Sequence, residues 1–308
     1  MTHHPVPVKP IIQYVGSKMS LAARIVALFP AGHTSYVEPY VGSAAVLLAK
    51  PRVPVELIND YDGGLINLYR LLQRKETRYD LIDALNYTPY SRREFEVAMG
   101  RHDPDGYDLK ADPIEWARRF MVRTNQRYVG GSSGTWTSTI RGSSGHSNAS
   151  KWQNYRERLN AVAHRLEEVQ IDCDDALSVL ARLWNKGGPE IAVYLDPPYV
   201  MESRAGALYL NDELSAHHER LLHLAAQLTG PVVISGYESD LYDDKLGAAG
   251  AGWAKYAIPV KASGQAGKGR TSDRVEVLWA NPQCVVPPWS ITADAAVDPV
   301  ALVDEVAS

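Results

Sequence analysis

The amino-acid sequence predicts an α/β protein built on a mostly parallel, doubly wound sheet of seven strands. Short apolar runs rich in β-forming residues alternate with amphipathic helical patterns, which is typical of such sheets. Several strand-like runs end in an acidic residue, at the position where open α/β sheets bind their ligands. The alternation is broken once, between residues 76 and 150, which indicates an insertion.

The composition is that of an ordinary globular protein, with 308 residues of which 45% are hydrophobic and 22% charged. A formal net charge of −4 argues against a histone-like basic protein but leaves room for a basic cleft. Two cysteines, Cys173 and Cys284, are too few for a disulfide framework, so we expect both in the core of a protein from a reducing compartment. No run approaches the ~18 apolar residues of a membrane span, and the start lacks a signal-peptide pattern. We therefore expect a cytoplasmic protein without membrane contact.

The first 75 residues contain two strand-like runs, each followed by a helical pattern. After an extended, proline-containing lead-in over residues 1–10, Pro30 stops an amphipathic run that Ser17 could cap. A β-prone run then passes through a turn at Gly42 into a helix, and the second such run ends at Asp60. In order, we expect a helix over 20–29, a strand over 34–40, a helix over 46–50, a strand over 55–60 and a helix over 64–75.

The turn after the first strand has the order of a nucleotide-binding corner: a strand, a tight glycine turn and a helix N-terminus. Its spacing is not Gly-x-Gly-x-x-Gly, which disfavours a pyrophosphate, and Glu38 before the turn favours a cationic or hydroxyl-bearing ligand. Asp60 ends the next strand about twenty residues later, where a carboxylate accepts hydrogen bonds from ribose hydroxyls. Lys18 could lie at the mouth of the site and pair with a carboxylate.

The interruption concentrates arginines and aromatic residues between Gly/Ser-rich stretches. Residues 130–134 and 142–145 are rich in Gly and Ser and flank 135–141, whose alternation is that of a hairpin strand. Arginines that track phosphates and aromatics that touch bases favour a DNA-reading insertion, although a linker or a solvated charged face has the same composition. The residues concerned are Arg92, Arg93, Arg118, Arg119, Arg123, Arg127 and Arg141, with Trp116, Tyr128 and Trp136 among them.

The alternation resumes after the interruption and continues to residue 280. Ser150 and Asn211 each precede a helical pattern that they could cap. The last strand-like run alternates apolar and polar residues, so it could be an antiparallel addition, and the tail 287–308 is expected to be partly ordered. In order, we expect a helix from 150 to about 169, a strand over 170–175, a helix over 175–185, a strand over 190–199, a helix over 213–228 and strands over 230–237, 253–261 and 274–280.

The run 191–199 carries the clearest chemistry, because a buried apolar strand ends there in Asp196, Pro197, Pro198 and Tyr199. The prolines end the strand since they donate no ladder hydrogen bonds. The Asp196 carboxylate and the Pro197 carbonyl are two acceptors that suit an amino group with two donors, and Tyr199 offers a face for a planar base. These residues predict a clamp for an exocyclic amine; the alternative is a strand that ends in a simple proline turn with Asp196 as a cap.

Several motifs in chain order point to one protein family. They are Tyr14-Val-Gly-Ser-Lys18, Glu38-Pro-Tyr-Val-Gly-Ser-Ala44, Ile58-Asn-Asp60, Asp196-Pro-Pro-Tyr199, Ser235-Gly-Tyr237 and Glu276-Val-Leu-Trp-Ala-Asn281. With these motifs the chain resembles the Dam-type, DPPY-motif adenine-specific DNA methyltransferases from residue 11 to about residue 283. The resemblance implies a class I methyltransferase fold that binds S-adenosylmethionine (AdoMet). It implies a catalytic domain over 11–75 and 150–283, an inserted and mainly helical DNA-recognition domain with a hairpin over 76–149, and tails at 1–10 and 287–308.

The resemblance also implies roles for residues of the cofactor site. Gly16 and Lys18 would hold the methionine end of AdoMet, residues 38–42 would lie under the methionine and the sulfonium, and Asp60 would accept the ribose hydroxyls. One of two consecutive aspartates would take the amine of the cofactor's adenine. The cofactor-binding residues are then Tyr14, Gly16, Ser17, Lys18, Glu38, Pro39, Tyr40, Gly42, Asp60, Asp174 and Asp175.

On the DNA side, the resemblance implies that residues 196–199 hold the flipped target adenine. The hairpin with which Dam enzymes read GATC is matched only loosely, by Arg123-Thr-Asn125 and the Gly/Ser-rich stretch after it, so the recognition sequence is not predicted. Ala44 stands where the family usually has a second glycine, and a small residue there should be tolerated. The DNA-contacting residues are then Arg123, Asn125, Arg127, Trp136 and Arg141.

The expected reaction is the transfer of a methyl group from AdoMet to the 6-amino group of adenine in double-stranded DNA, after the base has been flipped out. No metal is needed, and the sequence has no metal-ligand cluster. The alternatives are methylation of an amine on cytosine in DNA or on RNA, and a DNA-binding relative without catalysis. The oligomeric state and the existence of a restriction partner stay open.

Overall fold

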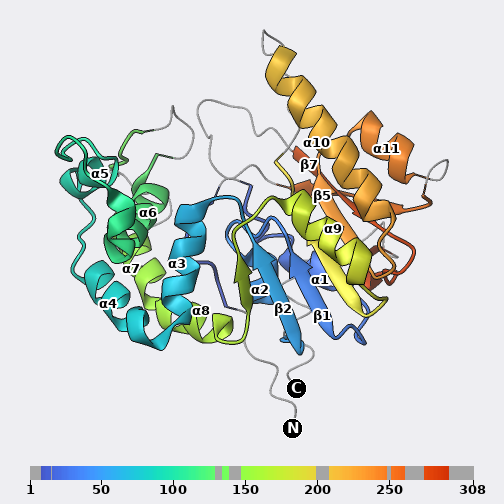
Figure 1. Ribbon diagram of the computed structural model, residues 1–308, viewed down its shortest axis with the longest axis horizontal. Coiled ribbons are helices and arrows are strands. Elements are labelled where there is room, and N and C mark those ends of the chain that lie inside the picture. Colours follow the sequence, from blue (N-terminus) through green and yellow to red (C-terminus); the bar gives the residue numbers. More distant parts are fainter. Residues whose placement is uncertain are drawn as a thin grey trace.

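The structure is a computed structural model that describes residues 8–14, 16–128, 134–138, 147–198, 208–247, 251–260 and 274–290 (Figure 1). These described residues form a seven-stranded sheet in the order β3-β2-β1-β4-β5-β7-β6. Strands β1 to β5 run parallel, whereas β7 is antiparallel to both β5 and β6. The predicted mostly parallel α/β sheet and its antiparallel last strand are confirmed. The strands are β1 Ser35–Glu38, β2 Val55–Asn59, β3 Gln170–Asp172, β4 Ile191–Leu195, β5 Val232–Gly236, β6 Ala254–Val260 and β7 Arg274–Ala280.

Helices cover both faces of the sheet, as a doubly wound fold requires (Figure 1). Successive residues of β1 and β4 point to opposite faces, so Tyr36 and Tyr194 join one apolar core and Val37 and Val193 join the other. The first core contains side chains of α1 Ala22–Val26, α2 Ala45–Ala49, α3 Gly63–Gln73 and α8 Leu159–Leu166. The second contains side chains of α9 Ala176–Lys186, α10 Leu208–Ala226 and α11 Asp240–Leu246.

Between α3 and α8 the chain forms a helical lobe, residues 75–157, which lies beside α3 in Figure 1. Helix α6 packs on α3, and Phe120 and Trp152 are buried in the same core that the sheet uses. The Trp152 indole N–H donates to the Thr88 carbonyl (2.8 Å), which ties α7 to the segment after α4. The lobe contains α4 Lys75–Asn86, α5 Arg92–Ala98, the 3-10 turn η1 Leu109–Ala111, α6 Pro113–Gln126 and α7 Asn148–Glu157. The domain boundaries expected at residues 76 and 149 stay a prediction.

Ser17 and Cys173 have surroundings that differ from those expected. Helix α1 begins after Leu21, whose apolar side chain cannot cap it, and Ser17 lies four residues before that position. The Ser17 hydroxyl contacts the Ser43 hydroxyl (2.8 Å). Cys173 is exposed and not in the core. It follows β3, which is an edge strand of the sheet and has a neighbour on one side only.

Two other predicted helix starts are wrong. Ser147 caps α7 by accepting the Ser150 N–H (3.0 Å), so Ser150 lies inside the helix that it was expected to cap. The helix expected from 150 to about 169 is divided at Arg158 into α7 and α8. Helix α10 begins at Leu208, so Asn211 lies within it. Before α7 more than one polar residue precedes the helical pattern, and the pattern does not decide which of them is the cap.

The hairpin expected after α6 is described only at its base. Arg127 and Trp136 form an antiparallel bridge, supported by a hydrogen bond from the Tyr128 N–H to the Thr135 carbonyl (2.8 Å). Most of the remaining expected strand, including Arg141, lies outside the described residues.

Within the described part of the chain, no helix combines the length and the apolar character that a membrane crossing needs.

Candidate active site

The candidate site lies at the carboxyl edge of the sheet, between β1 and its neighbour β4, where the strand order reverses. At such a switch point the loops diverge toward opposite faces and leave a crevice for a ligand. Glu38 ends β1, Asp60 follows β2 and Asp196 follows β4. The fold therefore brings three of the predicted acids to one edge from distant parts of the chain.

The Asp196 carboxylate is held by two partners, both on Oδ1. The Ser235 hydroxyl donates a hydrogen bond at 2.8 Å, and the Lys18 ammonium lies 2.9 Å away. Among the residues that the structure describes, none donates to Oδ2, and the Asp196 side chain is 21% exposed. One carboxylate oxygen is thus anchored, while the other has no donor among the described residues.

Lys18 is buried against Asp196 and does not stand at the mouth of the site. Its side chain is 4% exposed, its ammonium donates to the Gly16 carbonyl at 2.7 Å, and Glu276 Oε2 lies 3.9 Å away. Lys18 thus meets a carboxylate of its own chain, as its position suggested. In a place with little water, each charge of this pair stabilises the other.

The surroundings of Asp196 act on its pKa in opposite directions. Burial raises the pKa, because the carboxylate loses hydration, whereas Lys18 and Ser235 favour the charged form and oppose this effect. Ser235 has a single proton, which it gives to Asp196, so the Tyr194 hydroxyl donates to Ser235 in turn (2.8 Å). The role of Ser235 was not predicted. The available signal was its place in the Ser-Gly-Tyr motif at the end of β5, the neighbour of β4.

The loop after β1, residues 38–44, is fixed by the residues around it. Gly42 donates its N–H to Asp60 Oδ2 (2.9 Å), and its carbonyl accepts a hydrogen bond from the Tyr69 hydroxyl (2.8 Å). A β-carbon on Gly42 would lie 3.1 Å from the Tyr14 ring, and its φ of +45° is left-handed, so both space and backbone favour glycine. Ala44 is also left-handed, with φ 57°, which gives a physical reason for the glycine usual at this position.

Asp60 and Asn59 fasten the strand ends beneath this loop. Asp60 also accepts the Asp62 N–H (3.0 Å), and its backbone hydrogen bonds oppose the effect of burial, which raises its pKa. Asn59 is buried and donates to the carbonyls of Pro39 (2.9 Å) and Asp174 (3.0 Å). It links the ends of β1, β2 and β3. No role was predicted for Asn59, although its place directly before Asp60 was a signal.

Glu38, the last residue of β1 and the first of the loop, has only 2% of its surface exposed. Its carboxyl group accepts hydrogen bonds from the Tyr36 hydroxyl (2.9 Å) and from the Leu47 N–H in the first turn of α2. Burial raises the pKa of Glu38 to about 8, and the nearby Asp196 charge adds to the increase. A buried carboxyl group of this kind suits a cationic ligand, which would favour its ionised form.

Asp174 and Asp175 both have partners within the protein. Asp174 pairs with Arg182 (2.8 Å), which lowers its pKa, and Asp175 caps α9 by accepting the Leu177 N–H (3.0 Å).

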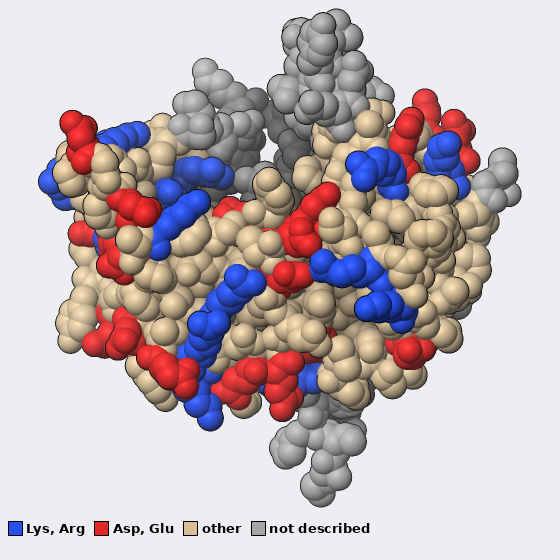
Figure 2. All heavy atoms as spheres, viewed as in Figure 1, with Lys and Arg blue, Asp and Glu red and all other residues tan. Residues whose placement is uncertain are grey.

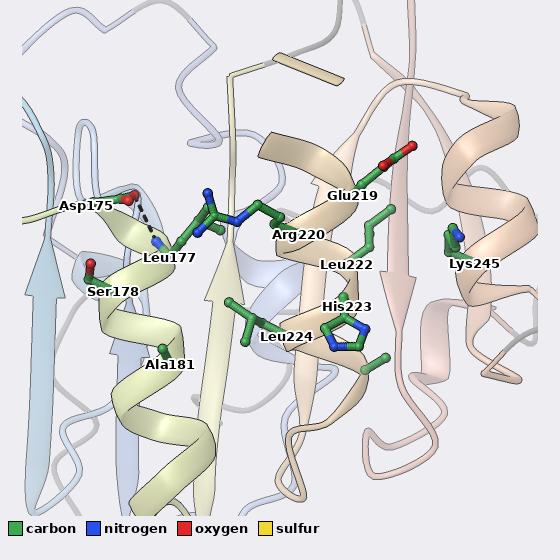
Figure 3. A pocket seen from close by; sticks show the side chains of 11 residues that line it. Asp175, Leu177, Ser178, Ala181, Glu219, Arg220, Leu222, His223, Leu224 and Lys245 are labelled. Atoms are coloured by element: carbon green, nitrogen blue, oxygen red, sulfur yellow. Dashed lines mark hydrogen bonds between the residues drawn. The ribbon is translucent and has the colours of Figure 1, made fainter. Parts of the chain in front are cut away.

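A cavity of about 670 Å³ lies between α9, α10 and α11, and Asp175 is the one predicted site residue among the described residues that line it (Figure 3). Among the described residues, no group of three or more His, Cys, Asp and Glu side chains is placed to hold a metal ion.

Two arginines of the expected DNA-reading insertion are committed to ion pairs within the helical lobe. Arg118 contacts Glu94 (2.7 Å) and Glu115 (2.6 Å), and Arg119 contacts Asp103 (2.7 Å). The interpretation of all the arginines as one phosphate-tracking surface is wrong for this pair, because acids of the same lobe neutralise their charge. Figure 2 shows the same mixture, with basic and acidic side chains interspersed over this part of the surface.

Asn125 is turned inward and does not face a groove for DNA. Its amide oxygen accepts the Gln13 N–H (2.8 Å), and its amide nitrogen donates to the Ile11 carbonyl (3.0 Å). The side chain is buried and fastens the N-terminal segment to α6. The expected role in DNA reading does not fit this position, because both polar ends of the amide are already used.

Arg123, Arg127 and Trp136 stay candidates for a DNA-contacting surface at the end of α6 and the strand base after it. Arg123 is half-buried, and burial lowers its pKa. Trp136 lies against Tyr90 with their ring centres 5.4 Å apart. Tyr199, the residue expected to stack on the target base, lies outside the described residues.

Comparison with known proteins identifies the family. The model of the D12 class N6 adenine-specific DNA methyltransferases matches residues 14–249. Among solved structures, the chain is similar to a SAM-dependent methyltransferase from Agrobacterium tumefaciens, with 12% identity and a TM-score of 0.37, over 86% of this chain and 62% of that chain. Methyltransferases of the matched family are enzymes, and AdoMet is the methyl donor that the match implies. Because the family model covers most of the chain, the protein belongs to the D12 class N6 adenine-specific DNA methyltransferase family.

Proposed function

We propose that this protein methylates the 6-amino group of adenine in double-stranded DNA, with AdoMet as methyl donor and with the target base flipped out of the helix. The observation that carries the proposal is the anchored Asp196 carboxylate at the end of β4. Lys18 and Ser235 hold Oδ1, which leaves Oδ2 and the Pro197 carbonyl to accept the two N–H groups of an amine. Family membership supports adenine as the base that carries this amine.

The proposed chemistry follows from the weakness of the nucleophile. The lone pair of the adenine amine is delocalised into the ring, so the nitrogen attacks poorly. Two acceptors on its N–H groups favour a pyramidal nitrogen, and the Asp196 carboxylate stabilises the positive charge that develops on it. As the new C–N bond forms, the bond between the methyl carbon and the AdoMet sulfur would break, S-adenosylhomocysteine would leave, and the nitrogen would release one proton to solvent. The carboxylate must be ionised to act in this way, and Lys18 and Ser235 favour that form.

Base flipping is the step that brings the amine to Asp196. Unstacking the base costs a few kcal/mol, and stacking on Tyr199, worth ~1–3 kcal/mol, would offset much of this. We assign DNA binding to residues 76–149 and methyl transfer to residues 11–75 and 150–283. On the DNA side, the proposed contacts are Arg123, Arg127, Trp136 and, outside the described residues, Arg141.

The side chains around the 38–44 loop suit AdoMet by their chemistry. Glu38 offers a carboxyl group to a cation, and the Asp60 carboxylate, which already accepts the Gly42 and Asp62 N–H groups, offers an acceptor to a ribose hydroxyl. Gly42 allows close approach of the ligand. Tyr61, which the sequence analysis did not single out, follows Asp60, is 84% exposed and offers a flat face to the cofactor's adenine. AdoMet supplies the electrophilic methyl group, and these residues bind and orient it.

The test is incubation with isotopically labelled AdoMet and unmethylated double-stranded DNA, followed by digestion to nucleosides and mass spectrometry. We expect N6-methylated adenine with the wild-type protein and none with Asp196→Ala, whose AdoMet affinity should stay within several-fold of wild type. Methylated cytosine, or product on RNA alone, would overturn the proposed substrate. AdoMet binding without any methylated nucleoside would identify a DNA-binding relative without catalysis.

A further inference from the structure

Helix α10 carries two adjacent histidines that contact the two halves of the candidate site. His217 Nε2 lies 2.8 Å from the Tyr40 hydroxyl, which belongs to the 38–44 loop. His218 Nε2 lies 2.9 Å from the carbonyl of Pro198, directly after the Asp196-Pro197 pair. Consecutive residues of an α-helix point about 100° apart, so one short stretch of helix reaches both segments. Neither histidine belongs to a motif that the sequence analysis used.

The hydrogen bonds of His218 determine its protonation. The Pro198 carbonyl can only accept, so Nε2 of His218 must carry the proton that joins them. In the neutral ring Nδ1 is then an acceptor, and the Tyr242 hydroxyl, 2.6 Å away on α11, is its donor. Burial lowers the pKa of His218, and the neighbouring His217 adds to this effect, which is consistent with a neutral ring. The orientation of His218 is therefore set at both of its nitrogens.

The packing around His218 leaves its ring little freedom. The residue is 2% exposed, and Tyr242 packs in turn on Trp279 of β7 with ring centres 4.7 Å apart. The ring of His217 meets that of Tyr40 nearly edge to face, at 77°. These rings join α10, α11 and the sheet. A shift of the 38–44 loop would therefore break the hydrogen bond between Tyr40 and His217, and a shift of the segment after β4 would break the one between His218 and Pro198.

We propose that His217 and His218 are positioning residues that hold the 38–44 loop and the Asp196–Pro198 segment at a fixed separation. The inference rests on the proposed function, in which the first segment carries the methyl donor and the second the amine. Transfer requires the two reacting atoms to approach to about 3–3.5 Å in line, and a displacement of about 1 Å can lower the rate a hundredfold. Loss of the histidine contacts should therefore lower kcat more than it weakens the binding of AdoMet.

The central experiment measures kcat at saturating AdoMet and the AdoMet dissociation constant for His218→Phe, which keeps an aromatic ring and loses both hydrogen bonds. We expect kcat to fall about 10- to 100-fold, with the AdoMet dissociation constant within about threefold of wild type. His218→Gln places an amide N–H near the position of Nε2, so it should recover most of the lost kcat. His223→Phe, on the exposed side of the same helix, is the matched control and should keep the wild-type kcat.

A second variant keeps the test valid if His218→Phe does not fold. Tyr242→Phe retains the imidazole but removes the donor to Nδ1, so the proton is free to move to Nδ1 and the bond to Pro198 is weakened; a several-fold loss of kcat is expected. Wild-type turnover measured in the same assay separates failure of this inference from failure of the proposed function. Three results would overturn the inference: a folded His218→Phe with nearly wild-type kcat, a loss confined to AdoMet affinity, or a His218→Gln no better than His218→Phe.

Discussion

Replacing Lys18 with methionine removes the ammonium group 2.9 Å from Asp196 Oδ1 and keeps most of the side chain's length. At that distance the attraction is about 6 kcal/mol for an effective dielectric constant near 20, and desolvation of the charges offsets part of it. Removing one partner of a buried pair typically costs about 3–5 kcal/mol. Because the Asp196 side chain is 21% exposed, we expect the lower end of this range. The loss falls on the ionised form of Asp196, which the reaction needs, so about 3 kcal/mol corresponds to roughly a hundredfold smaller population of that form and a rate lower by the same factor.

The loss should depend on pH in a defined direction. Without Lys18 the charged form of Asp196 loses its main support, so the pKa of Asp196 rises further and the protonated carboxyl no longer serves as a free acceptor. We expect Lys18→Met to transfer methyl groups roughly a hundredfold more slowly at pH 7 and to recover as the pH is raised. Single-turnover rates from pH 6 to about 9, with AdoMet affinity measured on the same preparation, would test this expectation.

Lys255→Met is the matched control, because Lys255 forms a partly exposed ion pair with Asp243 (2.6 Å) away from the candidate site. Such surface pairs contribute about 0–1 kcal/mol, so its rate and pH profile should be those of wild type. If Lys18→Met weakens AdoMet binding but keeps the wild-type rate at saturating cofactor, Lys18 holds the methionine end of AdoMet, as the family resemblance implied. An unchanged pH profile would refute the coupling between Lys18 and Asp196.

Three further predictions concern the cofactor site and the helical lobe. Asp60→Ala should weaken AdoMet binding at least about tenfold, because charge-assisted bonds to two ribose hydroxyls are worth ~1.5–3 kcal/mol each. The DNA sequence preference should not change. Calorimetry measures the first effect, and sequencing of methylated DNA measures the second. Since burial raises the pKa of Glu38 to about 8 and a bound sulfonium would lower it again, AdoMet binding at pH 7 should release a proton and strengthen as the pH rises. Calorimetry in two buffers of different ionisation enthalpy should detect this release in wild type and lose it in Glu38→Gln. Arg127→Gln should reduce the salt dependence of DNA binding by roughly one unit of log–log slope, whereas Arg118→Gln should leave it unchanged, because Arg118 is already paired. Equal slopes for the two arginine variants and wild type would remove Arg127 from the DNA surface.

The sequence alone was sufficient to predict the sheet. The apolar run before Asp196, which is followed by two prolines, forms the buried strand β4. The alternation of such runs with helical patterns predicted the mostly parallel sheet, and the period-2 pattern of the last strand-like run was compatible with the antiparallel β7. These features depend on residues close together in sequence, because strands and helices repeat every two or 3.6 residues.

Only the tertiary structure decided which side chains meet. The sequence shows that Lys18 is charged and that Asn125 is polar, but it does not show their partners. In the structure Lys18 pairs with Asp196, and the Asn125 amide forms hydrogen bonds with backbone groups of the N-terminal segment. The hydrogen bond from Asn59 to the Asp174 carbonyl joins residues 115 positions apart, and no local pattern encodes it. A hydrogen bond or a buried ion pair forms only when its atoms come within about 3 Å, a condition that folding creates between distant segments. For this reason the anchoring of Asp196 by Ser235, the neutralised arginine Arg118 and the histidines of α10 became visible only in the folded chain.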